Sequence, residues 1–251
     1  MNHERRNKIA KMLESNPTVT NSEIMERFGV SIETVRRDLS ALEKRGVLER
    51  VYGGAVKKNF INTEPGYDGR EKSNTKEKQA IALAAKKFIN VNDTVFFDIG
   101  TTVWMIAKNI DESKKITGFT NSLRTAVALA ERDFKVFIPG GSLRKGELAV
   151  SGSIAEQNMR CFNIDKAFIG VGGISEEGIT DFIESEASFR KQIIKNARTV
   201  IAVADHSKFS IRAMCNICGA EEIDILITDK KAPGNILKAL ERNGTKIVIA
   251  P

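Results

Sequence analysis

The sequence predicts an α/β protein in two parts, a small helical N-terminal unit followed by a larger, mainly parallel α/β domain. Two short helical patterns separated by a glycine come first, and a basic hairpin pattern follows them. Strand-like and helix-like runs then alternate to the C-terminus. The 251 residues leave room for a small domain and one core of ordinary size. We therefore predict a first unit at 1–58, a linker at 59–74 and a second domain at 75–251.

The first unit begins with a helix that carries clear start and stop signals. Thr20 to Glu23 has the form of a capping box, because a hydroxyl is followed three residues later by a carboxylate. Gly29 then ends this helix, since glycine adopts a left-handed turn at little cost. Ser31 is expected to cap a second helix directly after the turn. Two helices joined in this way predict a helix-turn-helix.

The second helix is the predicted recognition helix. Its apolar side chains, Val35, Leu39 and Leu42, repeat at i, i+4 and i+7 and should face the core. The outer face of its first turns should then meet the edges of bases in the DNA major groove. Arginine there binds either a guanine edge or a phosphate. The candidate contacts on this helix are Ser31, Glu33, Thr34, Arg36 and Arg37.

A short hairpin, centred on Gly53-Gly54, is expected to form a wing beside the helices. Its Arg50, Lys57 and Lys58 are placed to follow a phosphate strand. Residues 1–58 carry a net charge of +4 out of the +7 of the whole chain. A solvated helix with a few arginines would explain an arginine pair, but not the capped helices with a basic hairpin. The predicted partner is therefore duplex DNA.

Several other classes of protein are disfavoured by composition. The sequence has no apolar run of the 18 or more residues that a membrane helix needs. Its N-terminus lacks the apolar stretch of a signal peptide. Three cysteines do not make the disulfide framework of a small secreted domain. We therefore expect a cytoplasmic protein that does not bind membranes.

The second domain reads as a mainly parallel sheet with helices between its strands. Runs rich in Val, Ile and Phe alternate with amphipathic runs, which is typical of such a sheet. The expected strands are 94–97, 116–119, 135–138, 166–169, 199–203, 225–227 and 246–249. The expected helices include 102–110, 122–131, 185–197 and 235–242, after a first helical pattern near 81–88.

The carboxyl ends of these strands carry residues suited to a small anionic ligand. Ligands of parallel sheets bind at that edge, where glycines, hydroxyls and helix N-termini supply N–H donors to phosphate. Lysine and arginine add positive charge, and aspartates accept hydrogen bonds from sugar hydroxyls. The candidates are Asp98, Gly100, Thr101, Thr102, Asn121, Gly140, Gly141, Arg144, Gly170, Gly172, Asp205 and Lys208. Singly, such loops are ordinary turns; five at one edge favour a polyhydroxylated anion.

The pair Cys215 and Cys218 raises the possibility of a metal or redox site. Structural zinc needs about four ligands, and the sequence has no second pair of this spacing. The surrounding segment has the alternation of a strand, so buried free thiols are the better interpretation. We therefore predict no metal and no cofactor.

The motifs together resemble the DeoR family of transcriptional regulators over nearly the whole chain. The matching segments are 31–39, 53–55, 98–102, 120–122, 140–144, 165–174, 204–209 and 226–229. The resemblance implies a winged helix-turn-helix joined to a sensor domain similar to ribose-5-phosphate isomerase. Such proteins usually repress sugar-catabolism operons, act as homodimers or homotetramers and respond to a phosphorylated sugar. It also implies that Arg190 lies near the ligand.

The same resemblance raises an alternative, a sugar-phosphate isomerase-like enzyme with an appended DNA-binding domain. Aldose–ketose isomerisation needs a carboxylate base beside the reacting carbons. The isomerases carry acids in an Asp-Gly-Ala-Asp-Glu segment, whereas the similar stretch here is Ile169-Gly170-Val171-Gly172-Gly173. Binding groups without the base indicate a sensor and not an enzyme.

Overall fold

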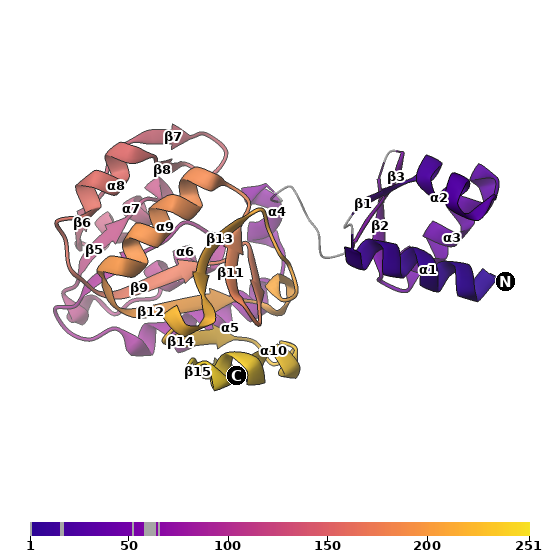
Figure 1. Cartoon of the computed structure of the whole chain (residues 1–251). Helices are drawn as coiled ribbons and strands as arrows, with labels where there is room; N and C mark the ends of the chain where they lie inside the picture. The colour runs from indigo at the N-terminus through magenta and orange to yellow at the C-terminus, as the bar shows by residue number, and fades with distance from the viewer. Residues whose placement is uncertain (1, 16–17, 52, 58–63, 65) are drawn as a thin grey trace. The chain divides into compact units, whose positions relative to one another are not determined.

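The computed structural model describes residues 2–15, 18–51, 53–57, 64 and 66–251. These residues form two units, Met1–Asn62 and Thr63–Pro251 (Figure 1). Each unit has hydrophobic core residues of its own. The predicted division into a small N-terminal part and a larger α/β part therefore corresponds to two separately packed bodies.

The first unit is a winged helix-turn-helix. Its elements are α1 (Asn2–Ser15), β1 (Thr18–Thr20), α2 (Asn21–Phe28), α3 (Ile32–Lys44), β2 (Leu48–Val51) and β3 (Gly54–Lys57). The three strands make an antiparallel sheet in the order β1-β3-β2. The two predicted helices and the hairpin are confirmed. Helix α1 and strand β1 were not predicted.

Local signals in the sequence account for the turn and the hairpin. The Thr20 hydroxyl accepts from the Glu23 backbone N–H at 3.2 Å, and the Glu23 carboxylate accepts from the Thr20 N–H at 2.7 Å. Gly29 has φ +60°, the left-handed conformation expected of it. A Cβ on Gly54 would lie 2.1 Å from the Val19 carbonyl oxygen, so only glycine lets β3 approach β1 so closely.

A buried charge lies among the apolar core residues of this unit. Val35, Leu39 and Leu42 are buried as predicted, and Asp38 on α3 is buried beside them. The Asp38 carboxylate accepts from Arg5 at 2.6 Å and from Arg6 at 2.8 Å. These hydrogen bonds to a charged group join α1 to α3, and so α1 helps to hold the recognition helix in place.

The second unit is built on a seven-stranded sheet whose order is β15-β14-β12-β9-β4-β5-β6. Every neighbouring pair in it is parallel, which confirms the predicted fold class. The strands are β4 (Thr94–Phe97), β5 (Thr117–Thr120), β6 (Lys135–Phe137), β9 (Ile164–Gly170), β12 (Ala197–Ala204), β14 (Ile225–Thr228) and β15 (Lys246–Ile249).

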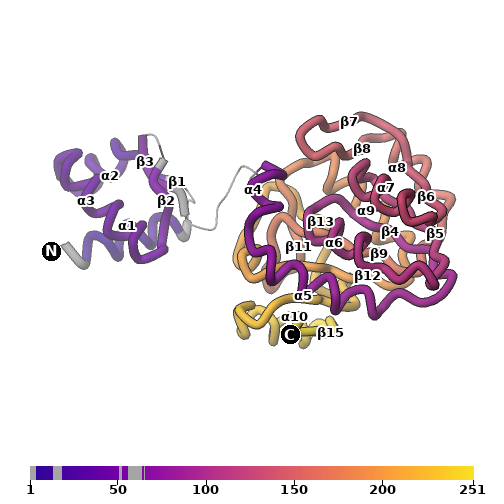
Figure 2. The backbone as a smooth tube through the Cα atoms, turned by 180° about the vertical axis from the view of Figure 1, so that it is seen from behind, coloured from indigo at the N-terminus to yellow at the C-terminus, as the bar shows by residue number. Residues whose placement is uncertain are grey.

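Helices cover both faces of this sheet (Figures 1 and 2). Along β4, Val95 and Phe97 belong to one hydrophobic cluster and Phe96 to the other, because successive side chains of a strand point to opposite faces. The helices of the first face are α5 (Thr75–Ala85), α6 (Thr101–Lys108) and α7 (Leu123–Ala130). Those of the second are α8 (Ser153–Met159), α9 (Glu184–Asn196) and α10 (Gly234–Arg242).

Smaller elements complete the second unit. Strands β10 (Gly173–Ser175), β11 (Gly178–Asp181) and β13 (Cys215–Gly219) form an antiparallel sheet, and β7 (Ser142–Arg144) pairs with β8 (Ala149–Ser151). Short 3-10 turns occur at Lys86–Phe88, Glu112–Lys114, His206–Lys208 and Ala220–Glu222. None of the described helices has the length and apolar character of a membrane span.

The cysteine pair lies in β13, the strand suggested by its alternating pattern. Cys215 and Cys218 are free thiols as predicted, but both are half-buried and not fully buried, and burial raises the pKa of Cys218 to about 12. Within the described ranges, no group of three or more His, Cys, Asp and Glu side chains is arranged to hold a metal ion. A thiol with so high a pKa is a poor nucleophile and a poor metal ligand at neutral pH.

The segment 59–74, predicted as a linker, differs from that expectation in its second half. Residues Tyr67–Lys72 form helix α4, which belongs to the second unit. The Tyr67 ring is buried, and the guanidinium of Arg124 on α7 lies over it at 4.2 Å. The second unit therefore begins before 75, and α4 is its first helix.

Candidate functional site

The first turns of α3 carry the candidate DNA contacts in an accessible arrangement. Glu33, Arg36 and Arg37 are exposed, whereas Val35 between them is buried. Neither arginine has a hydrogen bond or ion pair with any residue that the structure describes. Their guanidinium groups are thus available to an external acceptor such as a base edge or a phosphate.

The other candidate DNA contacts of this unit differ in whether their side chains are free, paired or outside the described residues. Ser31 occupies the N-cap position of α3, but its hydroxyl makes no capping bond and lies 3.4 Å from the Thr34 hydroxyl. Arg50 on β2 is exposed and donates to the Glu43 carboxylate at 2.8 Å, which ties the wing to α3. Lys57 ends β3, and its side chain, like the whole of Lys58, lies outside the described residues.

The second unit contains a cavity of about 350 Å³ at the carboxyl ends of β4, β9 and β12. Strands β4 and β9 are neighbours in the sheet. The chain continues from β4 to β5 and β6 on one side of this pair, and from β9 to β12, β14 and β15 on the other side. Loops that follow such a pair diverge to opposite faces, and the crevice between them is the usual ligand site of open parallel sheets. A volume of this size accommodates a small metabolite.

The walls of the cavity include groups that attract an anion. Gly100 precedes α6, and the N–H groups and hydroxyls of Thr101 and Thr102 form the first turn of that helix. Lys208, after β12, also lines the cavity, and its ammonium has no hydrogen bond or ion pair in the described part of the chain. Burial lowers the pKa of Lys208, and the charge of Arg70 lowers it further.

On the opposite wall of the cavity, Gly170 and Gly172 contribute only backbone atoms. A Cβ on Gly170 would lie 2.8 Å from the Ile99 carbonyl oxygen, and one on Gly172 would lie 3.0 Å from the Thr180 carbonyl oxygen. A side chain at Gly170 would therefore push apart the loops that follow β4 and β9. These positions leave room for a ligand without supplying an acid or a base.

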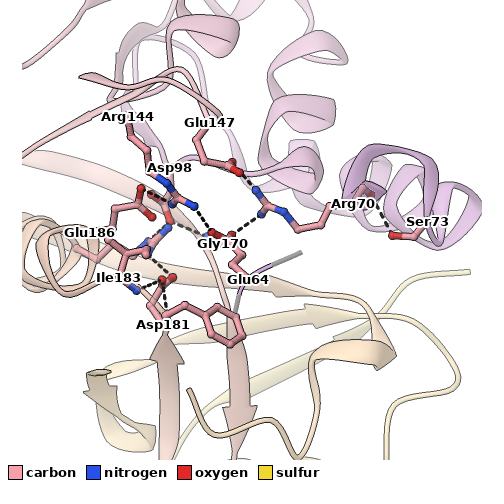
Figure 3. A network of polar contacts seen from close by, with 12 residues as sticks. Glu64, Arg70, Ser73, Asp98, Arg144, Glu147, Gly170, Asp181, Ile183 and Glu186 are labelled. Carbon is pink, nitrogen blue, oxygen red and sulfur yellow. Dashed lines mark hydrogen bonds and ion pairs between the residues drawn. The ribbon is translucent and has the colours of Figure 1, made fainter. Parts of the chain in front are cut away.

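A buried arginine lies behind this wall. The Arg190 Nε donates to Asp98 at 2.5 Å, and a second nitrogen of the same guanidinium donates to Asp181 (Figure 3). The Gly170 N–H donates to the same oxygen of Asp98 at 3.0 Å. All three ionic side chains are at least 96% buried. Burial raises the pKa of Asp98, and the charge of Arg190 opposes that rise.

Next to it runs a chain of alternating carboxylates and arginines, here called the rim network. Its members in order are Glu147, Arg70, Glu64, Arg144 and Glu186 (Figure 3). Glu64 accepts from Arg70 and from Arg144, each at 2.8 Å, and Arg144 donates to Glu186 at 2.8 Å. Burial raises the pKa of Glu186, one of whose oxygens has no partner in the structure.

The structure brings together most, but not all, of the residues that the sequence suggested for the ligand. Those that line the cavity are Gly100, Thr101, Thr102, Gly170, Gly172, Arg190, Asp205 and Lys208. Those that do not are Asp98, Asn121, Gly140, Gly141 and Arg144. Asp98 is fully buried because its carboxylate turns toward Arg190, so it is not presented to a ligand.

The loop after β5 is buried under other parts of the chain, whereas the loop after β6 is held against α8 with Gly141 exposed. The Val150 N–H donates to the Asn121 carbonyl at 2.8 Å, which brings β8 over the loop after β5. The amide of Asn158 on α8 donates to the Pro139 carbonyl at 2.7 Å, beside the Gly140 turn. The expected convergence of five loops is therefore reduced to the three that follow β4, β9 and β12.

Several residues that line the cavity were not predicted from the sequence. They are Glu64, Arg70, Ser73, Lys78, Asp181 and Ser207 among the polar ones. The Lys78 ammonium donates to the backbone carbonyls of Arg70 and Ser73 and so closes the C-terminal end of α4. Asn74 donates to Asp205 at 2.9 Å. Three of them, Glu64, Arg70 and Ser73, lie in the segment 59–74, whose two basic and three acidic residues gave no signal of an anion site.

Two family descriptions match the chain. Residues 5–59 match "DeoR-like helix-turn-helix domain" and residues 73–230 match "DeoR C terminal sensor domain". The first range spans the winged helix-turn-helix, and the second contains the seven-stranded sheet up to β14. Glu64 and Arg70 fall between the two matched ranges.

Characterised relatives align along almost the entire chain. The transcriptional regulator GlpR of Haloferax volcanii is 35% identical over 98% of this chain and 96% of its own. The transcriptional repressor GlcR of Bacillus subtilis is 34% identical over 96% and 93%. The glycerol-3-phosphate regulon repressor of Escherichia coli is 31% identical over 94% of each.

Solved structures show weaker similarity. Ribose 5-phosphate isomerase A of Methanocaldococcus jannaschii aligns with a TM-score of 0.41 and 14% identity over 55% of each chain. A probable sor operon regulator of Shigella flexneri aligns with a TM-score of 0.44 and 12% identity over 80% of this chain and 97% of that one. Similarities this low support no argument about ligand or reaction.

Replacing Arg190 with Met should destabilise the second unit. Removal of the guanidinium leaves Asp98 and Asp181 buried without their counter-charge, which costs about 3–5 kcal/mol when a buried pair is broken. Arg190→Lys retains the charge and should lose less. Chemical denaturation of the full chain measures the effect, with Lys191→Met, a change of an exposed neighbour, as the control. Equal stability of Arg190→Met and the control would contradict a structural role.

Proposed function

Because the chain belongs to the DeoR family of transcriptional regulators, we propose that it represses a sugar-catabolism operon under the control of a phosphorylated sugar. The observation that carries the proposal is the combination of unpaired cationic groups in the two units. Arg36 and Arg37 project from α3, and Lys208 lines a metabolite-sized cavity. Relatives named as a glycerol-3-phosphate regulon repressor and as the repressor GlcR support this assignment.

The proposed partner of the first unit is double-stranded operator DNA. Helix α3 enters the major groove with its first turns, and the wing lies along the neighbouring phosphates. In the free protein Arg50 forms an ion pair with Glu43. To bind a phosphate, the Arg50 guanidinium must either break this ion pair or contact both groups at once. Proteins of this kind bind two half-sites through a two-fold axis, so we propose a homodimer or a homotetramer.

The proposed ligand of the second unit is a phosphorylated sugar. The N-terminal turn of α6 and the Lys208 ammonium hold the phosphate group. Asp205 uses one carboxylate oxygen for Asn74 and Ser207, and its other oxygen is left for a sugar hydroxyl. A thermal-shift screen of the full chain against phosphorylated sugars and their unphosphorylated forms tests this. No shift with any phosphorylated sugar would contradict the proposal.

Arg36→Ala and Arg37→Ala should each weaken DNA binding by roughly 1–3 kcal/mol if the arginine reads a base. Each variant loses a contact in the DNA groove, whereas the buried side chains of α3 are unchanged and should keep the fold intact. Binding to a duplex selected by the wild-type chain from a random library measures the effect at physiological salt. Arg160→Ala is the control, because Arg160 is an exposed arginine at the C-cap of α8. Unchanged binding by both α3 variants, with folding intact, would refute the docking.

Thr101→Ala and Lys208→Ala should each weaken binding of the best sugar phosphate from the screen about tenfold or more. A hydrogen bond to a charged group contributes roughly 1.5–3 kcal/mol. Because burial lowers the pKa of Lys208, its charge is lost at a lower pH than that of an ordinary lysine. Affinity should therefore fall as the pH rises, and Lys208→Arg should retain affinity at the higher pH. Identical pH profiles would contradict the role of Lys208.

The rival function is sugar-phosphate isomerisation, favoured only by the carboxylates that line the cavity. Three carboxylates line the cavity in the described part of the chain, and each already has partners. Asp181 is bound to Arg190, Glu64 is bound to Arg70 and Arg144, and Asp205 accepts from Asn74 and Ser207. A general base must instead lie free beside the reacting carbons. We expect the purified chain to interconvert no aldose and ketose phosphates in a coupled assay. Turnover that disappears in Asp205→Asn would make the second unit an enzyme.

A further inference from the structure

Glu64 is a charged residue at the connection between the two units that is bound inside the second one. It follows Asn62, the last residue of the first unit, by two positions. Its carboxylate nevertheless lines the ligand cavity, and only 9% of its side chain is exposed. One oxygen accepts from Arg70 and the other from Arg144, each at 2.8 Å (Figure 3). Glu64 is thus held at the cavity by ion pairs with two arginines.

The two arginines that hold Glu64 are also held by other carboxylates. Arg70 on α4 donates to Glu147 as well, and Arg144 on β7 donates to Glu186. If Glu64 leaves, neither guanidinium becomes a buried charge without a partner, which is the costly outcome when an ion pair is broken. The rim network is therefore built so that its middle carboxylate can be released while the rest stays in place.

An anionic ligand enters the same space as this carboxylate. Arg70 and Glu64 line the cavity together with Lys208, and the charges of both act on the Lys208 ammonium. A phosphate bound at Lys208 repels the Glu64 carboxylate and offers its own oxygens to Arg70. Arginine binds phosphate and carboxylate with the same planar fork, so a phosphate can take the place of Glu64 at Arg70.

We propose that Glu64 is a carboxylate latch, which holds the segment leading from the DNA-binding unit against the cavity until an anionic ligand displaces it from Arg70. The inference rests on the proposed sugar-phosphate site. Latch and ligand compete, so each weakens the other by the same factor. Ligand binding then frees the chain that precedes α4, and this is the route by which occupancy of the cavity reaches the DNA-binding unit.

The first test measures the latch without any ligand. Glu64→Gln removes the negative charge at nearly constant size, so the full-length variant should exchange amide hydrogens faster in the peptide that contains Glu64 and Gly66. Glu147→Gln is the matched control, because it removes a buried carboxylate from the same Arg70 but lies outside the cavity lining. The control should leave exchange in that peptide near wild type. Wild-type exchange in Glu64→Gln would overturn the latch.

The second test uses inorganic phosphate as the probe. By calorimetry, Glu64→Gln should bind phosphate roughly 5–10-fold more tightly than wild type, within the usual range of coupling between sites. Glu147→Gln should stay within about twofold of wild type, because Glu64 still occupies the cavity in that variant. Equal phosphate affinity in wild type and Glu64→Gln would overturn the latch and leave the anion site intact. Absence of phosphate binding in both would overturn the proposed site together with the latch.

The third measurement connects the latch to DNA. Phosphate should change the affinity of the wild-type chain for its selected duplex, whereas Glu64→Gln should bind that duplex equally with and without phosphate. The Glu147→Gln control should keep the response. A response of wild-type size in Glu64→Gln would show that the signal travels by another route and would overturn the proposal.

Discussion

The architecture around the cavity depends on one buried guanidinium. Arg190 of α9 binds Asp98, directly after β4, and Asp181 at the end of β11. Asp98 also accepts from the Gly170 N–H at the end of β9. Through Asp98, this one arginine links the carboxyl ends of β4 and β9, the two neighbouring strands from which the chain continues in opposite directions. Buried ion pairs of this kind add little net stability, but they penalise any packing that leaves a member unpaired.

Several buried and half-buried charges serve the fold, whereas some candidate functional charges are left without an ionic partner within the described ranges. Asp38 is satisfied by Arg5 and Arg6, and Asp205 holds Asn74 against the cavity. Arg36, Arg37, and Lys208, in contrast, have no ionic partner among the residues that the structure describes. Exposed residues such as Arg160 and Lys191 also lack an ion pair among the described residues, so what marks Arg36, Arg37 and Lys208 is their position. The two arginines lie on the first turns of α3, and Lys208 lines the cavity.

Sequence patterns predicted the sheet well because its signals are local. The strands 94–97 and 246–249 match β4 and β15 residue for residue, since each is a short run rich in β-branched or aromatic residues. Helix α4 escaped prediction because only Tyr67 in it is buried, and that burial comes from Arg124 far along the chain. A six-residue helix stabilised by distant contacts leaves no periodic trace in its own sequence.

The candidate residues were predicted at one edge of the sheet, and the structure places some of them in the lining of a cavity there and others outside it. Beyond the end of β4, Gly100 and Thr101 line the cavity, whereas the side chain of Asp98 faces Arg190. Sequence places a residue at the end of a strand, but the direction of its side chain depends on what packs beside it. Glu64 and Arg70 were missed for the same reason, because their roles arise from partners many residues away.

The distribution of charge explains why Glu64 is the group that yields when a ligand arrives. The rim network and the Arg190 cluster together contain five carboxylates and three arginines, so another anion adds to an excess of negative charge. Asp98, Asp181 and Glu186 follow or belong to packed strands and helices, and moving them would disturb the core. Glu64 precedes the first helix of the second unit, so its carboxylate can leave at the lowest cost in packing. The site for the ligand and the attachment of the connecting segment are therefore parts of one electrostatic system.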